Sequence, residues 1–191
     1  VDNYTFTANH SYIQTTWQGA YQAINRANSV IGRVPAITMD EALRNRIVAE
    51  AKFLRALHYF NLVRLFGGVP LIVEETTNID NLQRPRATAD EVWAQIFKDL
   101  TEAAAVLPIR YTGADLGRAT SGAAKTLLAK AYLHRASITA AGAATRTTDY
   151  QRALQLVQDV RLNNGYAVVS VFGTLFVLVT VNYGVVLVGM L

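Results

Sequence analysis

Three histidines are the first residues of this 191-residue chain to test for metal or acid–base chemistry: His10, His58 and His134. None has a second histidine or a carboxylate three or four residues away, and the chain contains no H-E-x-x-H motif. Those spacings matter because they place two ligands on one face of a helix. The chain also lacks cysteine, which excludes a thiolate zinc site and a cysteine nucleophile. The sequence therefore predicts no metal site and no cofactor.

The acidic residues do not form a catalytic pattern. Hydrolysis of a glycosidic bond needs two opposed carboxylates at a fixed separation. Here the acidic pairs Asp40-Glu41, Glu74-Glu75 and Asp90-Glu91 fall at predicted helix starts or in a loop. Favourable interaction with helix dipoles and solvation accounts for carboxylates in those places. Gly67-Gly68 is not a phosphate loop, since no Lys-Ser/Thr follows it. We therefore expect no enzymatic activity.

The residues at the start of the chain suit ligand binding better. Residues 1–12 are polar and aromatic and lie outside any strong helical pattern. A sugar site uses exposed aromatic rings for stacking, and amides or charges for hydroxyl groups. We therefore predict that this segment edges a glycan site, with Tyr4, Asn9 and Tyr12 as ligand-binding residues. A loop at residues 109–116 adds Arg110 and Tyr111. Ordinary loop packing is the alternative explanation for all of these side chains.

Composition narrows the classes of partner. Hydrophobic residues make up 51% and charged residues 17% of the chain, which indicates a well-buried interior. The formal net charge is +4, and the basic residues are scattered rather than gathered in a stripe. Nucleic-acid binding needs such a stripe or an aromatic-basic motif, so we do not expect it. The chain begins at Val1 without a signal-peptide pattern. We expect any export signal or lipid-bearing residue to lie upstream.

One long helix, predicted over residues 40–66, organises the rest of the chain. Apolar residues recur there at steps of three or four, which predicts a stripe of Leu43, Ile47, Ala51, Leu54, His58 and Leu62. Thr38 and Glu41 have capping-box spacing and mark the predicted start. Gly67-Gly68 and Pro70 mark its end. We expect His58 to be a core histidine, and Glu50 and Arg55 to form ion pairs with another helix.

The remaining sequence predicts four more helices. Helix starts fall near residues 13, 40, 89, 121 and 150, with Ser11, Thr88 and Thr120 as capping residues. The last helix is predicted over 149–162, with Ala153, Leu156, Val157 and Val160 as its apolar stripe. A spacing of about thirty residues is typical of tetratricopeptide-like helical hairpins. The predicted fold class is therefore all-α, built of antiparallel hairpins.

The first helix carries four residues that need an explanation. Trp17 and Tyr21 lie on its apolar face, and core packing is the favoured interpretation. Asn25 and Asn28 are unusual inside a helix. We expect them to bond a neighbouring backbone rather than a ligand.

The C-terminal residues differ from the rest. From Leu162 to Leu191 there is no charged residue, and Val and Leu predominate. The segment is long enough for a membrane span, but its β-branched residues favour two short buried strands. We therefore expect a helical domain over residues 1–166 and an apolar, β-like tail over 167–191.

Several stretches together resemble the SusD/RagB family of glycan-binding outer-membrane lipoproteins. The most specific is AEAKFLRALHYFNLVRLFGGVPL at residues 49–71. EVWAQIFKDLTEAAAVLP at 91–108, GRATSGAAKTLLAKAYLH at 117–134 and the weaker YQRALQLVQDVRLNNGYAV at 150–168 follow in the family's order and spacing. The resemblance covers roughly residues 12–176 and departs after Val177. Family members are longer, so it implies an N-terminal portion with a truncated or altered tail.

The resemblance implies a non-catalytic scaffold at the bacterial outer-membrane surface. Such a scaffold captures oligosaccharides and hands them to a SusC-like TonB-dependent transporter. The resemblance also implies a lipid anchor, and it transfers no ligand residue by motif. Two other functions stay open on the residues alone. One is a helical-repeat adaptor that binds a peptide or protein partner, and the other, weakly supported, is an enzyme.

Overall fold

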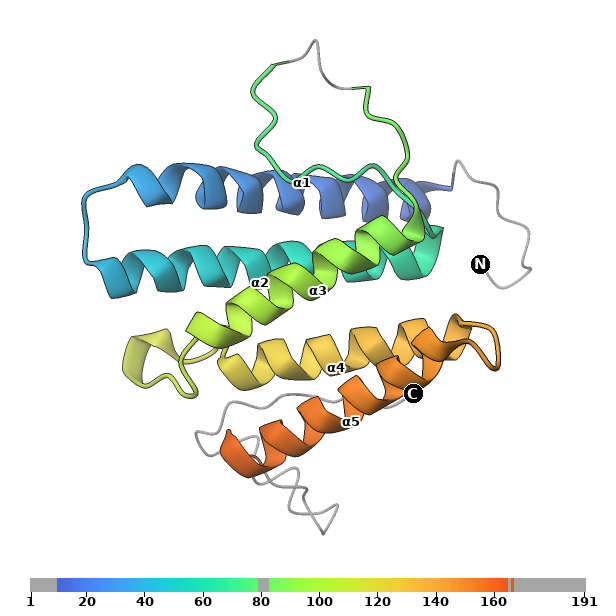
Figure 1. The fold of residues 1–191 in the computed structure, drawn as a ribbon. Helices are drawn as coiled ribbons and strands as arrows, with labels where there is room; N and C mark the ends of the chain where they lie inside the picture. Colours follow the sequence, from blue (N-terminus) through green and yellow to red (C-terminus); the bar gives the residue numbers. More distant parts are fainter. Residues whose placement is uncertain (1–9, 79–82, 165, 167–191) are drawn as a thin grey trace. The chain divides into compact units, whose positions relative to one another are not determined.

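The computed structural model describes residues 10–78, 83–164 and 166, and most of them lie in helices (Figure 1). The helices are α1 (Ser11–Arg33), α2 (Glu41–Phe66), α3 (Ala89–Val106), α4 (Ser121–Ile138) and α5 (Ala144–Asn163). Short 3-10 turns lie at Val34–Ala36 and Gly113–Asp115. No strand occurs in this described part, which confirms the all-α prediction. The predicted tail, 167–191, lies outside the described residues, and the domain boundary at residue 166 stays a prediction.

The chain divides into two compact units, Val1–Glu102 and Ala103–Leu191, which are described separately. The first unit contains the α1–α2 hairpin and most of α3. The second contains the α4–α5 hairpin. In both hairpins the two helices run antiparallel and pack on each other (Figure 1). Among the described helices, none combines the length and the apolar character that a membrane crossing requires.

The two helices of the first hairpin start within two residues of the predicted positions, but their caps are His10 and Asp40 rather than the predicted Ser11 and Thr38. Helix α1 begins at Ser11, and His10 is its cap, because the His10 imidazole accepts a hydrogen bond from the amide of Tyr12 at 3.3 Å. Helix α2 is capped by Asp40, whose carboxylate accepts from the amide of Leu43 at 2.8 Å. The proposed Thr38 cap is therefore wrong. A carboxylate next to the helix start adds a favourable interaction with the helix dipole.

Helix α2 is buried on several sides, but the predicted apolar stripe is only partly right. Ala51 and Leu62 are buried, whereas Leu43 and Leu54 are 38% and 48% exposed. The buried residues of α2 do not form one stripe, because two neighbouring helices cover different sides of it. Helix α1 packs on one side, and Trp93 of α3 meets Phe60 with ring centroids 6.0 Å apart. Periodicity identifies the helix but not which of its faces receives each partner.

The end of α2 is fixed by two glycines and an arginine. Gly67 has a φ of +69°, a backbone conformation that favours glycine. A Cβ on Gly68 would lie 2.2 Å from the carbonyl oxygen of Ala87, so no side chain fits there. The Arg86 guanidinium donates to the carbonyl oxygens of Phe66 and Gly68. These contacts terminate the helix and hold the return of the chain beside it.

The caps predicted for α3 and α4 are confirmed. The Thr88 amide donates to the Glu91 carboxylate at 2.8 Å, and the Glu91 amide donates back to the Thr88 hydroxyl at 3.3 Å. The Thr120 hydroxyl accepts from the amide of Ala123 at 3.1 Å. Both are short-range patterns of the kind that the sequence shows directly.

Helix α5 begins five residues before the predicted start at Asp149. Asp149 does not cap it, because its carboxylate is buried and accepts two hydrogen bonds, both 2.6 Å long, from Arg135 of α4. The apolar stripe predicted for α5 is also partly wrong. Ala153 is buried, as expected, but Val157 is 54% exposed.

Candidate functional site

The candidate ligand-binding edge lies at the first turn of α1. Of the three predicted site residues, Tyr4 and Asn9 lie outside the described residues. Tyr12 is the second residue of α1 and is 70% exposed. Its ring stacks on that of His10, with centroids 5.2 Å apart and planes 26° apart. The pair presents a flat aromatic surface with a polar edge, to which the C–H face of a sugar ring could pack.

A second aromatic group anchors this end of α1 to the end of α2. The ring of Trp17 lies 4.9 Å from that of Tyr21 and meets Phe66 edge-on at 5.1 Å. The Tyr21 hydroxyl donates to the carbonyl oxygen of Pro70 at 2.8 Å. Burial raises the pKa of Tyr21 above its ordinary value, so the hydroxyl stays a donor. Trp17 and Tyr21 pack against aromatic neighbours, as expected, but both are half-buried rather than part of the buried core.

Arg110 and Tyr111, the other aromatic and charged residues considered for a sugar site, lie in the second unit. Arg110 is exposed and Tyr111 is half-buried. They stay a prediction.

The asparagines of α1 bond backbone, as expected. The extended segment at residues 69–76, here called the strap, runs along α1 and α2. The Asn28 side chain donates to the carbonyl oxygens of Ile72 and Glu74, each at 2.9 Å, and the Asn25 side chain accepts from the amide of Thr76 at 2.9 Å. Both side chains are thus used inside the fold rather than in a ligand site.

Sequence reasoning missed the part that Tyr59 of α2 takes in holding the strap. Tyr59 is buried, and its hydroxyl bonds the backbone of Ile72. A tyrosine among many apolar helix residues gives no signal that its hydroxyl meets a loop thirteen residues later. Only the position of Pro70, which prevents the helix from continuing, indicated an extended piece.

The charged residues of α2 behave as predicted in one case and differently in another. Arg55 forms an ion pair with Asp99 of α3 at 2.7 Å. Glu50 lies 3.9 Å from Arg46 of its own helix, and its expected ion pair with another helix stays a prediction. His58 is half-buried rather than enclosed, and burial lowers its pKa. Within residues 10–78, 83–164 and 166, no three histidine or carboxylate side chains are grouped so as to hold a metal ion.

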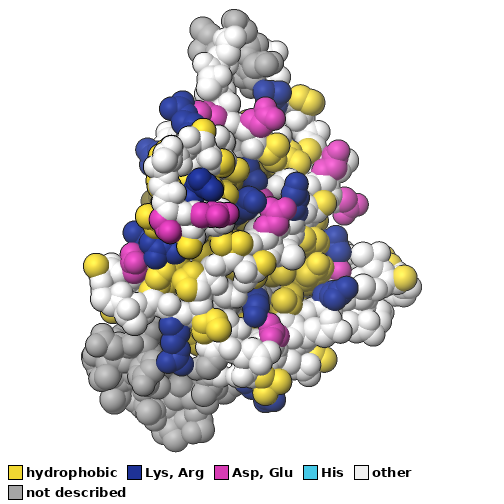
Figure 2. Space-filling model, turned by 60° about the vertical axis from the view of Figure 1, so that its left-hand side comes forward, with side chains coloured by type: hydrophobic (Ala, Val, Ile, Leu, Met, Phe, Trp, Pro, Cys, Tyr) yellow, Lys and Arg dark blue, Asp and Glu magenta, His cyan; other side chains and the backbone are white. Residues whose placement is uncertain are grey.

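The surface carries charges of both signs. On the face drawn in Figure 2, basic and acidic side chains of the described residues lie interspersed among apolar ones. On that face the charges of opposite sign lie close enough to offset one another.

The antiparallel helical hairpins define a helical-repeat scaffold. The comparisons with known proteins specify its family. Residues 1–133 match the model of the SusD-like family, described as starch-binding and associating with the outer membrane. The chain belongs to the SusD-like family.

A SusD-like protein of Bacteroides ovatus is 36% identical over 174 residues, which are 89% of this chain and 31% of that protein. A solved structure described as being with xylogluco-oligosaccharide is 35% identical and superposes with a TM-score of 0.78, covering 90% of this chain and 34% of the other. A laminarin-binding SusD-like protein is 34% identical, with a TM-score of 0.74 and coverages of 85% and 34%. The chain thus spans about a third of the length of each of these relatives.

Proposed function

We propose that the protein binds oligosaccharides at the bacterial outer-membrane surface without transforming them, and delivers them to a SusC-like TonB-dependent transporter. The observation that carries the proposal is the match in fold and sequence to two relatives described with xylogluco-oligosaccharide and with laminarin. The family's association with the outer membrane supports the location. Attachment through a lipid anchor upstream of Val1 is part of the same proposal.

Tyr12 is the described residue that we propose to contact the sugar, and Tyr4 and Asn9 are the other two proposed ligand-binding residues. The exposed Tyr12 ring, stacked on His10, offers the flat surface that a pyranose C–H face packs against. Its support comes from α1, which the contact between Trp17 and Phe66 ties to α2. A ring held in this way costs little ordering entropy when a ligand binds.

Calorimetry with xyloglucan oligosaccharides and with laminarin oligosaccharides tests this site. Tyr12→Ala should weaken affinity for the bound glycan by about tenfold, because one stacked ring is lost. Tyr12→Phe is the matched control, since it keeps the ring, and it should bind within about threefold of the original. Tyr4→Ala and Asn9→Ala should also weaken binding. Unchanged affinity in all three alanine variants would contradict the proposal that these residues contact the glycan.

The remaining parts of the proposal have separate tests. Affinity capture from solubilised outer membranes should retrieve a TonB-dependent transporter, and retrieval of no β-barrel protein would contradict the delivery step. Incubation with the bound glycan should release no new reducing ends. Measurable turnover would instead support the enzyme alternative.

A further inference from the structure

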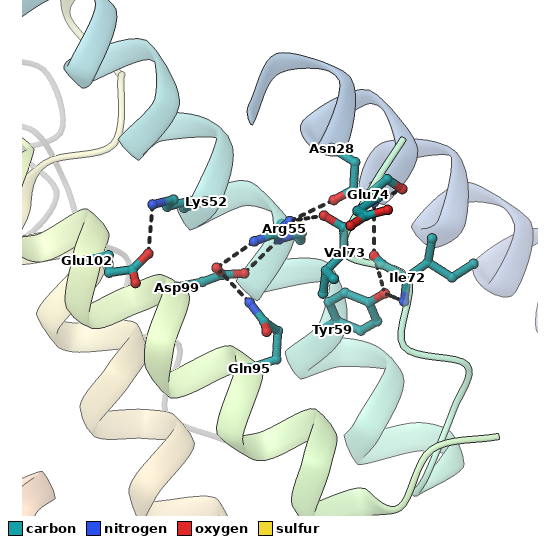
Figure 3. Close-up of polar contacts among 10 residues, drawn as sticks. All are labelled: Asn28, Lys52, Arg55, Tyr59, Ile72, Val73, Glu74, Gln95, Asp99 and Glu102. Atoms are coloured by element: carbon teal, nitrogen blue, oxygen red, sulfur yellow. Dashed lines mark hydrogen bonds and ion pairs between the residues drawn. The ribbon is translucent and has the colours of Figure 1, made fainter. Parts of the chain in front are cut away.

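One guanidinium group, that of Arg55, joins four segments of the first unit (Figure 3). Its Nε and one terminal nitrogen donate to the two carboxylate oxygens of Asp99 on α3, at 2.8 and 2.7 Å. The other terminal nitrogen donates to the side-chain oxygen of Asn28 on α1 at 2.8 Å and to the carbonyl oxygen of Val73 in the strap at 2.9 Å. Arg55 and Asp99 are 4% and 1% exposed. Gln95 adds a bond of 2.9 Å to the same carboxylate.

The strap is held mainly by side chains. Pro70 is bonded by Tyr21, Ile72 by Tyr59 and Asn28, Val73 by Arg55, Glu74 by Asn28, and Thr76 by Asn25. A strand in a sheet would instead be held by a continuous row of backbone–backbone hydrogen bonds to its neighbour. Here most of the bonded backbone groups depend on helical side chains, and the Ile72 carbonyl oxygen accepts from two of them, Asn28 and Tyr59. A change in one side chain can therefore release part of the strap.

A second ion pair joins the same two helices close by and provides a comparison. Lys52 of α2 bonds Glu102 of α3 at 2.7 Å, and both side chains are partly exposed. In Figure 3 the Lys52–Glu102 pair is drawn bonding α2 to α3 and, among the ten residues drawn, no bond joins it to the strap. The Arg55–Asp99 pair joins the same two helices, and Arg55 also bonds α1 and the strap.

We propose that Arg55 is a positioning residue that couples α3 to the strap, and that Asp99 sets its orientation. The guanidinium is a rigid plane, and a two-point bond to a carboxylate fixes the direction of the third nitrogen. With Asp99 in place, that nitrogen reaches Asn28 and Val73 together. Loss of Asp99 leaves the plane free to turn, and the strap loses its Val73 contact although Asp99 itself lies on another helix.

Amide hydrogen exchange on the full chain tests this coupling. The amides of Ile72 and Thr76 are the reporters, because both donate to helical side chains across the strap. The variant is Arg55→Met combined with Asp99→Leu, since replacing a buried pair by apolar residues often preserves folding. The matched control is Lys52→Met combined with Glu102→Leu, which removes the neighbouring α2–α3 bridge.

The expected result is a rise of about tenfold or more in exchange at Ile72 and Thr76 in the first variant, with unchanged protection in the middle of α2. The control should leave the strap amides within about twofold of the original. Equal strap protection in the two variants would overturn the proposal.

A second variant keeps the carboxylate in case the first does not fold. Asp99→Glu lengthens the side chain by one methylene and displaces the guanidinium, so strap exchange should still rise. Glu102→Asp, the corresponding change of length in the neighbouring pair, should not raise it. Unchanged strap exchange in folded Asp99→Glu would also refute the coupling.

Discussion

The hydroxyl of Tyr59 bonds both backbone groups of a single residue, Ile72. It accepts from the Ile72 amide at 2.7 Å and donates to the Ile72 carbonyl oxygen at 2.9 Å. Burial raises the pKa of Tyr59 to about 12, so the proton required for the second bond is present at neutral pH. One side chain of α2 thus bonds both the amide and the carbonyl group of a residue in the strap.

Removal of that hydroxyl should destabilise the fold measurably. Tyr59→Phe leaves the Ile72 amide without its acceptor while preserving the buried ring. The expected loss is about 1–3 kcal/mol in the free energy of unfolding, measured by urea denaturation. Tyr150→Phe is the control, because Tyr150 is a partly exposed residue of α5, and it should change stability little. Equal effects of the two substitutions would contradict the role given to Tyr59.

The two ion pairs between α4 and α5 should differ in strength. Asp149 is buried and receives two bonds from Arg135, whereas Asp159, bonded to Lys125 at 2.6 Å, is more exposed. Asp149→Asn should cost about 3 kcal/mol, because it leaves a largely buried guanidinium without its counter-charge. Asp159→Asn is the same chemical change on the same helix and should cost about 1 kcal/mol or less. Urea midpoints in the reverse order would refute this comparison.

Glycine-to-alanine changes should have opposite signs at two helical sites. At Gly19 of α1 a Cβ meets nothing within 4 Å, so Gly19→Ala should stabilise by about 1 kcal/mol through helix propensity. At Gly122 of α4 the same Cβ would lie 2.4 Å from the Tyr166 ring. The ring would have to move, and its hydroxyl would leave Thr120, now 3.1 Å away.

Gly122→Ala should therefore lower the free energy of unfolding, whereas Gly19→Ala should raise it. In thermal or urea unfolding the two variants should differ by about 1–3 kcal/mol. Tyr166→Ala removes the ring that the new Cβ would meet. In a Tyr166→Ala background, Gly122→Ala should therefore no longer lower the free energy of unfolding. A stabilising effect of Gly122→Ala alone would show that Tyr166 does not rest on this glycine in solution.

The stability of the first unit should fall in mild acid because of His58. Burial holds the pKa of folded His58 below its ordinary value of 6.5, so the unfolded chain takes up a proton first. The contribution is present above pH 6.5 and is lost as the pH falls from there toward the folded pKa. The difference between urea unfolding free energies at pH 7.5 and pH 5.5 should be smaller in His58→Gln than in the original protein. An identical difference would exclude His58 as the cause.

Local patterns predicted the helices well, and competition between neighbours explains the errors. Thr88 and Thr120 cap their helices through bonds that span three residues, which is the range that a sequence pattern reports. Thr38 fails because Asp40 supplies a carboxylate closer to the first turn. The exposed Leu54 shows the other limit. Which side of α2 is buried depends on where α1 and α3 pack, and the sequence of α2 does not contain that information.

The candidate site was predictable only in part. The residue type of Tyr12 predicts a ligand contact, and the structure places its ring exposed and stacked on His10, but in the first turn of α1 rather than before the helix. Tyr4 and Asn9 lie outside the described residues and stay predictions. The buried contacts of Arg55 with Asn28 and Val73 link residues far apart in the chain, and no short-range pattern reports such contacts.

The spacing of Tyr21, Asn25 and Asn28 limits which mutations this part of α1 can accept. All three reach the same extended segment from one side of α1, at steps of four and three residues. Deleting or inserting one residue between them would rotate one part of the helix against the other by about 100°. No single substitution could repair that rotation. Length changes in this stretch should therefore be far less acceptable than amino-acid replacements at its outward positions.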